Sequence, residues 1–157
     1  LISRELALDQ KATHGEIEKD LSMVGANLLI ESLKIIENGK LKFTNQDHSR
    51  ATYAKKIDKK ETKIDWDIDA NKVLSHIHGL SPSPAAWFEF ENERFKVLRA
   101  KTSSENGKPG HVLDENLTIG CGTNSVQILE IQRQGKNKQT TKEFLLGKKI
   151  NKGKILI

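Results

Sequence analysis

The sequence predicts an α+β protein with helices in the first part of the chain and a small β-barrel in the last part. Three observations support this prediction. Apolar residues recur at helical spacing within residues 1–43, residues 44–60 are polar and aperiodic, and after Pro84 apolar and polar residues alternate. A chain of 157 residues can form one ordinary domain or two small units. We therefore expect a helical segment at 1–43, a linker at 44–60 and a barrel domain with one or two short helices at 61–157.

The first segment carries start and stop signals for helices. Thr13-His14-Gly15-Glu16 fits the capping-box pattern, and Asn38-Gly39 favours a left-handed helix end. Between them the apolar residues at helical spacing are Ile17, Leu21, Val24, Leu28, Leu29, Leu33 and Ile36. We expect Gly25 to separate two helices and Leu1–Leu8 to form a strand. The apolar face of these helices has no obvious partner here, and the chain does not begin with methionine, so we expect a fragment of a longer protein.

The last segment begins with one helix and continues as short strands. We expect a helix at Asp65–Leu80 with Asp69 as a possible cap, ended by the prolines of Ser81-Pro82-Ser83-Pro84. The expected strands lie at 87–90, 95–99, 111–113, 117–121 and 125–131, the first two forming a hairpin around Glu91-Asn92-Glu93. Five short strands at this spacing are typical of a small closed barrel. A short helix is expected at Thr140–Leu146.

Positive charge is concentrated at the end of the chain. Residues 133–157 hold eight basic residues against Glu143 alone, although the net charge of the whole chain is only +5. Clustered lysines gain affinity for polyanions by releasing counterions from phosphates, so a polyanion site is one interpretation and a solvated surface is the other. Only Phe95 and Phe144 follow Phe90 as aromatic residues. This scarcity favours backbone contacts to folded RNA or duplex over stacking on single-stranded bases.

The residues that could perform catalysis form no known catalytic pattern. His76 and His78 are two residues apart, which places them on different sides of a helix, so we interpret them as surface histidines rather than a metal pair. Cys121 ends an apolar strand and is expected to be a buried structural thiol rather than a nucleophile. A single cysteine excludes an internal disulfide and favours a reducing compartment. The stretches free of charge are too short for a membrane span. The residues alone therefore predict a binding module.

The order of motifs resembles the C-terminal part of methionyl-tRNA formyltransferases. The longest matching segment, residues 76–87, is similar to the family pattern I-R-[AG]-[FL]-[NS]-P-x-P-[GA]-A-W. Other matching segments are Gln46-Asp47, Ala51–Ile57, Lys60-Glu61, Ile64–Trp66, Lys108–Val112, Cys121-Gly122, Ile131–Lys136, Phe144–Gly147, and Ile150 followed by Gly153. Residues 13–39 are similar to the last helices of the family's catalytic domain.

The resemblance implies a parent enzyme that transfers a formyl group from 10-formyltetrahydrofolate to the α-amino group of methionyl initiator tRNA. It implies that residues 1–43 end a Rossmann-like catalytic domain and that 61–157 form an OB-like tRNA-binding domain. The family's catalytic asparagine, histidine and aspartate would precede Leu1, so we expect no catalytic, cofactor-binding or metal-binding residue here. The expected partner is initiator tRNA, with no membrane or protein partner, in the cytoplasm. The expected tRNA-binding residues are Arg133, Lys136, Lys138, Lys142, Lys148, Lys149 and Lys152.

One position departs from the family pattern, and two alternatives stay open. His78 stands where relatives have an arginine, which weakens a charge expected near the domain interface. A related formyltetrahydrofolate-dependent hydrolase or sugar formyltransferase would use the barrel as a spacer, but a small substrate gives no reason for the basic C-terminal end. A free-standing RNA-binding module would leave the apolar face of the first helices uncovered.

Overall fold

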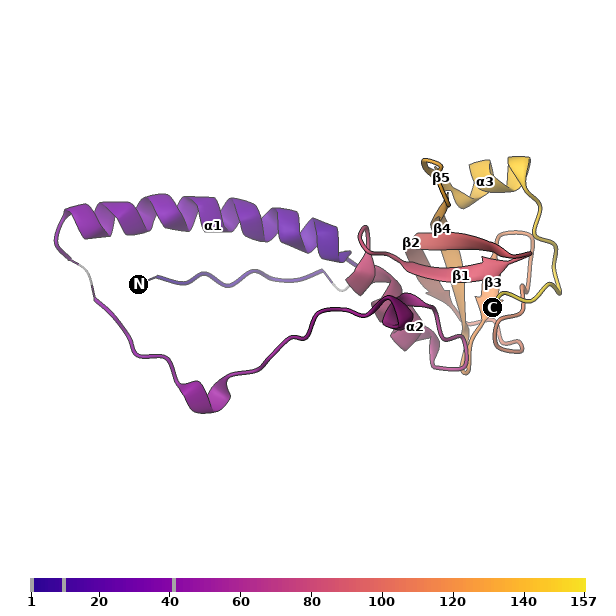
Figure 1. The fold of residues 1–157 in the computed structure, drawn as a ribbon, viewed down its shortest axis with the longest axis horizontal. Helices are drawn as coiled ribbons and strands as arrows, with labels where there is room; N and C mark the ends of the chain where they lie inside the picture. The colour runs from indigo at the N-terminus through magenta and orange to yellow at the C-terminus, as the bar shows by residue number, and fades with distance from the viewer. Residues whose placement is uncertain (1, 10, 41) are drawn as a thin grey trace. The chain divides into compact units, whose positions relative to one another are not determined.

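The computed structural model describes residues 2–9, 11–40 and 42–157. The chain divides into two compact units, Leu1–Lys56 and Ile57–Ile157, which we call the first and second unit. The first contains a long helix, and the second contains an antiparallel sheet with two further helices (Figure 1). The α+β class predicted from the sequence is confirmed. In the described ranges, no helix is both long enough and apolar enough to cross a membrane.

Helix α1, His14–Glu37, has the ends that the sequence predicts. At its start, the Thr13 amide donates to Glu16 Oε2 over 2.8 Å, which confirms the capping box. At its end, Gly39 adopts φ +64° and its amide donates to the Ile36 carbonyl over 3.0 Å. Such a left-handed residue satisfies carbonyls that the helix can no longer pair. None of the residues of α1 is buried.

Two expectations for the first unit are wrong. Helix α1 passes through Gly25 without a break, because one glycine costs a helix only about 1 kcal/mol and the strong helix formers Ala26, Leu28 and Leu29 follow it. Residues 2–8 form no strand, and Leu1 lies outside the described residues. A strand needs a neighbour to pair its amides and carbonyls, and the first unit offers none in its described part. The Arg4 guanidinium instead forms a 3.0 Å ion pair with Glu31 of α1.

The sheet of the second unit has the order β1-β2-β4-β3, with β5 also paired to β4. Its strands are β1 Ala86–Phe90, β2 Glu93–Ser103, β3 Thr118–Gly120, β4 Ser125–Arg133 and β5 Lys138–Thr140. The predicted hairpin is confirmed with a shorter turn. Glu91 and Asn92 alone form it, with φ of +51° and +60°, and Glu93 already pairs with Phe90.

The predicted strand at 111–113 is wrong, and β5 was not predicted. His111 pairs only with Ile155 and Val112 only with Ile119, so no ladder of consecutive pairs forms. Strand β5 is short and fully exposed, and therefore lacks the apolar alternation that would indicate it. Backbone bonds extend the sheet further. The Glu89 amide of β1 donates to the Ile157 carbonyl over 2.6 Å, and the Leu156 amide donates to Gly110 over 2.8 Å.

Helices α2, Ala70–Leu80, and α3, Thr141–Gly147, flank the sheet. Helix α2 begins five residues after the expected Asp65, because Asp65 and Asp69 each accept an amide two residues later, Asp65 within a turn and Asp69 as the helix cap. The prediction of Asp69 as a possible cap is confirmed. The short helix expected near Thr140–Leu146 is also confirmed, with Thr140 as its cap.

A chain of packed aromatic rings forms the centre of the core, which lies entirely in the second unit. The ring centroids are 6.3 Å apart for Trp66 and Phe88, 5.5 Å for Phe88 and Phe95, and 5.6 Å for Phe95 and Phe144. Phe144 of α3 thereby joins the end of the chain to the sheet. Helix α3, which carries Lys142, is consequently packed against the core.

Candidate nucleic-acid interface

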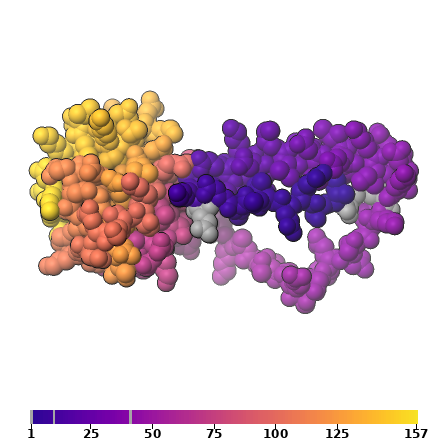
Figure 2. Space-filling view, turned by 180° about the vertical axis from the view of Figure 1, so that it is seen from behind, coloured from indigo at the N-terminus to yellow at the C-terminus, as the bar shows by residue number. Residues whose placement is uncertain are grey.

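The seven predicted tRNA-binding residues lie on one continuous stretch of structure, from the end of β4 to the segment after α3. We call them the C-terminal cluster. Arg133 ends β4, Lys138 lies in β5 and Lys142 lies on α3. Lys136 is in the turn before β5, and the remaining members follow α3: Lys148, Lys149 and Lys152. The last part of the chain, drawn in yellow, gathers on one side of the second unit (Figure 2).

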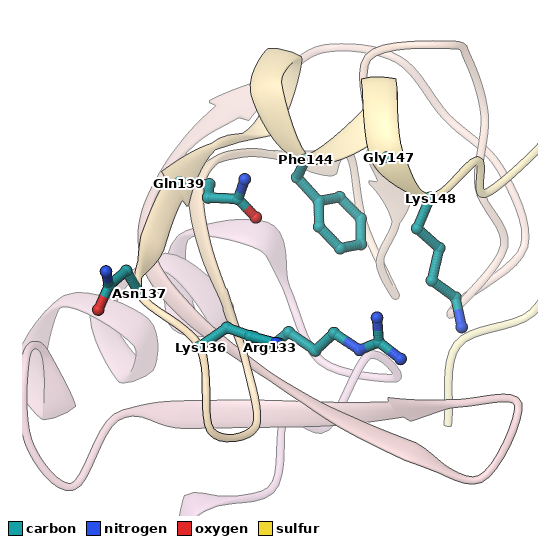
Figure 3. A pocket seen from close by; sticks show the side chains of 7 residues that line it. All are labelled: Arg133, Lys136, Asn137, Gln139, Phe144, Gly147 and Lys148. Carbon is teal, nitrogen blue, oxygen red and sulfur yellow. The ribbon is translucent and has the colours of Figure 1, made fainter.

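A hollow opens between the β4–β5 turn and α3, and it contains three members of the cluster. Arg133, Lys136 and Lys148 line it, together with the residues that the sequence did not indicate, Asn137, Gln139, Phe144 and Gly147. Arg133 and Lys148 approach the same space, next to the ring of Phe144 (Figure 3). The hollow therefore combines cations, amides and one aromatic edge.

Two of these cations are held by carboxylates of the β1–β2 hairpin, one in its turn and one at the start of β2. Glu93 forms an ion pair with the Arg133 guanidinium, and its Oε2 lies 2.9 Å from Lys148 Nζ. Lys148 Nζ also lies 3.2 Å from Glu91 Oε2. The hydrogen bond from Arg133, followed by that from Lys148, lowers the pKa of Glu93, and the bond to Glu93 raises the pKa of Lys148. Arg133 and Lys148 are therefore anchored, and much of their charge is compensated within the unit.

The remaining members of the cluster divide into one paired and four unpaired lysines. Lys138 Nζ lies 3.4 Å from Glu130 Oε2 across the β4–β5 pair. Four exposed lysines have no carboxylate within ion-pair distance in the described part of the chain: Lys136, Lys142, Lys149 and Lys152. These four offer phosphate contacts without first breaking an internal ion pair.

The fold also brings further cations beside the cluster that the sequence did not indicate. In the β2–β4 register, Phe95 pairs with Arg133 and Lys96 with Gln132. Arg94 and Lys96 thereby lie at the same end of the β2–β4 pair as Arg133, although they are almost 40 residues away in sequence. No local signal could have found them, because strand pairing alone brings them there.

The prediction that His76 and His78 are surface histidines is wrong for His78. It is 6% exposed, and its Nε2 lies 3.1 Å from the carbonyl oxygen and 3.3 Å from the amide nitrogen of Ala100 in β2. This contact falls where β2 bulges, so the imidazole fastens α2 to an irregular point of the sheet. His78, which the family pattern led us to expect near a domain interface, thus lies inside the second unit. His76 is half-buried.

Cys121 is a buried thiol, as predicted, with 2% of its surface exposed. Burial, with a smaller contribution from the charge of Asp69, raises the pKa of Cys121 from its ordinary value of 9.0 to about 11.

We expect Cys121 to react with iodoacetamide at pH 8 at least about 100-fold more slowly in the native protein than in guanidinium. The raised pKa leaves about 100-fold less thiolate, and burial blocks access further. The measurement is the rate of mass gain under both conditions. Comparable rates would show an exposed, reactive thiol.

The same pKa shift makes the stability of the fold depend on pH. Above about pH 9 the unfolded chain loses the proton of Cys121 before the folded chain does, so the free energy of unfolding falls as the pH rises toward 11.

The fold and the charge distribution together define a class of protein: an α+β domain with an aromatic core and a basic C-terminal face. Comparison with known proteins then identifies the family. The model described as "Formyl transferase, C-terminal domain" matches residues 56–149. The chain belongs to this family.

Curated relatives agree with the family match. The chain is 40% identical to a methionyl-tRNA formyltransferase of Bradyrhizobium diazoefficiens, over 97% of the chain and 50% of the relative. It is 41% identical to a methionyl-tRNA formyltransferase of Rhodopseudomonas palustris, over 93% of the chain and 48% of the relative. The predicted resemblance is confirmed, and the chain spans about half the length of the curated relatives it matches.

Solved structures share the fold. HypX from Aquifex aeolicus, in complex with tetrahydrofolic acid, superposes with a TM-score of 0.71 at 22% identity. The match covers 89% of this chain and 26% of that chain. At this level of identity the likeness concerns the fold alone.

Proposed function

We propose that this chain is the C-terminal part of a methionyl-tRNA formyltransferase. The parent enzyme would transfer a formyl group from 10-formyltetrahydrofolate to the α-amino group of methionyl initiator tRNA. The observation that carries this proposal is about 40% identity to enzymes of that name across 97% of the chain. As a translation enzyme it would act in the cytoplasm.

In this proposal the two units have different origins and roles. Residues 1–43 would end the Rossmann-like catalytic domain, 44–60 would be the linker, and 61–157 would be an OB-like tRNA-binding barrel. The wholly unburied helix α1, with Leu29 61% and Ile30 54% exposed, supports the first assignment. The barrel is supported by the backbone bonds that continue from β1 through Ile157 and Leu156 to Gly110, beside β3.

The tRNA would be held mainly by the four unpaired lysines of the C-terminal cluster: Lys136, Lys142, Lys149 and Lys152. Contacts to phosphates fix the position of a nucleic acid without reading its sequence. Arg133, Lys138 and Lys148 are paired with glutamates and would contribute less. Holding the body of the tRNA in this way would present the aminoacyl end to a catalytic domain at high effective concentration.

We assign no residue of this chain to binding of the folate co-substrate. A pterin ring needs an accessible aromatic or apolar slot, but four aromatic rings of the second unit pack on one another: Trp66, Phe88, Phe95 and Phe144. These four residues do not fit the group, so we derive no step through it.

The test is the affinity of the chain for methionyl initiator tRNA, measured by fluorescence anisotropy at several salt concentrations. Four phosphate contacts predict that the affinity falls about 100-fold between 50 and 200 mM salt. No binding at 50 mM would overturn the tRNA-binding role. The alternative, a barrel that serves as a spacer in a related hydrolase or sugar formyltransferase, would then be favoured.

A further inference from the structure

A second hollow lies beside the β4–β5 turn and shares Arg133 with the C-terminal cluster. It is lined by Arg94, Lys96, Gln132, Arg133, Gln134 and Gly135. Gly135 adopts φ +71° in the turn, and Gln132 Nε2 donates to the Lys136 carbonyl over 2.8 Å. The turn is therefore held in shape by a side chain of the sheet, and the hollow is a built feature rather than a gap between mobile side chains.

Arg94 forms one wall of this hollow as a rigid, planar cation. Its guanidinium carbon lies 3.6 Å from the centroid of the Trp87 ring, and its Nη2 lies 3.6 Å from Glu89 Oε1. Trp87 is itself fixed, because its indole N–H donates to Thr62 Oγ1 over 2.9 Å. Since 48% of the Arg94 side chain stays exposed, the stack of indole and guanidinium still presents surface to a ligand.

The other walls offer groups that suit a nucleotide. Lys96 has no carboxylate partner among the described residues, so it can meet a phosphate. The exposed amide of Gln134 supplies N–H donors and a carbonyl acceptor side by side, as the edge of a base requires. Unpaired bases in RNA are bound on aromatic rings or on guanidinium planes, whereas paired bases are not accessible in this way.

We propose that this hollow binds one unpaired nucleotide of the RNA, with its base against the Arg94–Trp87 stack and its phosphate near Lys96. The proposal rests on the proposed tRNA-binding function and adds a site to it. In the sequence, the small number of aromatic residues after Phe90 favoured backbone contacts over base stacking; this proposal differs, because the fold pairs Trp87 with Arg94 to make a platform.

The test compares Arg94→Lys with the unchanged chain on three labelled probes: a 12-nucleotide oligoadenylate, a 12-base-pair RNA duplex and methionyl initiator tRNA. Lysine keeps the charge and removes the plane. We expect affinity for oligoadenylate and tRNA to fall about fivefold or more, the low end of the loss of one stacked base, and affinity for the duplex to change less than twofold. Arg4→Lys, which alters another exposed, glutamate-paired arginine, is the matched control and should change none of them.

Equal losses on all probes, or no loss on oligoadenylate, would overturn the site while leaving tRNA binding intact. Binding of no RNA by the unchanged chain would overturn the proposed function together with the site. If the Arg94→Lys variant has a lower melting temperature, the Gln134→Ala variant is used in its place. Gln134 lies in an exposed turn, so its removal should not disturb the fold. We expect a selective loss of about threefold from this variant, and the absence of selectivity would overturn the proposal.

Discussion

Phe95→Ala should lower the free energy of unfolding of the second unit by about 3–5 kcal/mol, the usual cost of emptying a buried phenylalanine site. Phe95 is 0% exposed and stands in the middle of the aromatic chain between Phe88 and Phe144. Removal of the Phe95 ring opens a cavity and also removes the contact through which Phe144 packs α3 against the sheet. Surrounding strands can close such a cavity only in part, because their backbones are fixed by pairing.

Urea denaturation followed by tryptophan fluorescence measures this loss. Both tryptophans, Trp66 and Trp87, lie in the second unit, so the signal reports that unit. The matched control is Phe43→Ala, because Phe43 is 79% exposed and belongs to the first unit. We expect this control to change the free energy of unfolding by less than about 0.5 kcal/mol. A loss below about 1 kcal/mol for Phe95→Ala would contradict the described core.

Reversing the four unpaired lysines of the C-terminal cluster to glutamate should weaken RNA binding at least about 100-fold at 100 mM salt. The variant is Lys136→Glu, Lys142→Glu, Lys149→Glu and Lys152→Glu. Each change removes one cation that can release a counterion from a phosphate and adds one charge that repels it. All four side chains are exposed, so the fold should persist.

The measurement is anisotropy with labelled initiator tRNA, with circular dichroism to verify the fold. A control of equal charge change reverses four exposed lysines of the first unit: Lys11, Lys19, Lys34 and Lys40. This control should lose far less affinity. Similar losses for both variants would show that net charge, rather than the cluster, governs RNA binding.

Local signals in the sequence were sufficient for several elements. The capping box at Thr13, the cap at Asp69, the short helix near Thr140 and the hairpin near Asn92 were all predicted, because each depends on residues that are close to one another in sequence. Predictions failed where a distant partner decides the outcome. A strand was expected at residues 111–113, yet Ile119 and Ile155 form only single pairs with them.

The sequence alone determined the family, the α+β class and the concentration of lysines near the end of the chain, since these follow from motifs, periodicity and composition. Only the tertiary structure decided which of those charges stay available. Residues 133–157 contain a single acidic residue, but strand pairing brings Glu91, Glu93 and Glu130 to three of their cations. The same pairing adds Arg94 and Lys96. Ion pairs form between residues that are neighbours in space, and the order of residues in the chain does not show which residues these are.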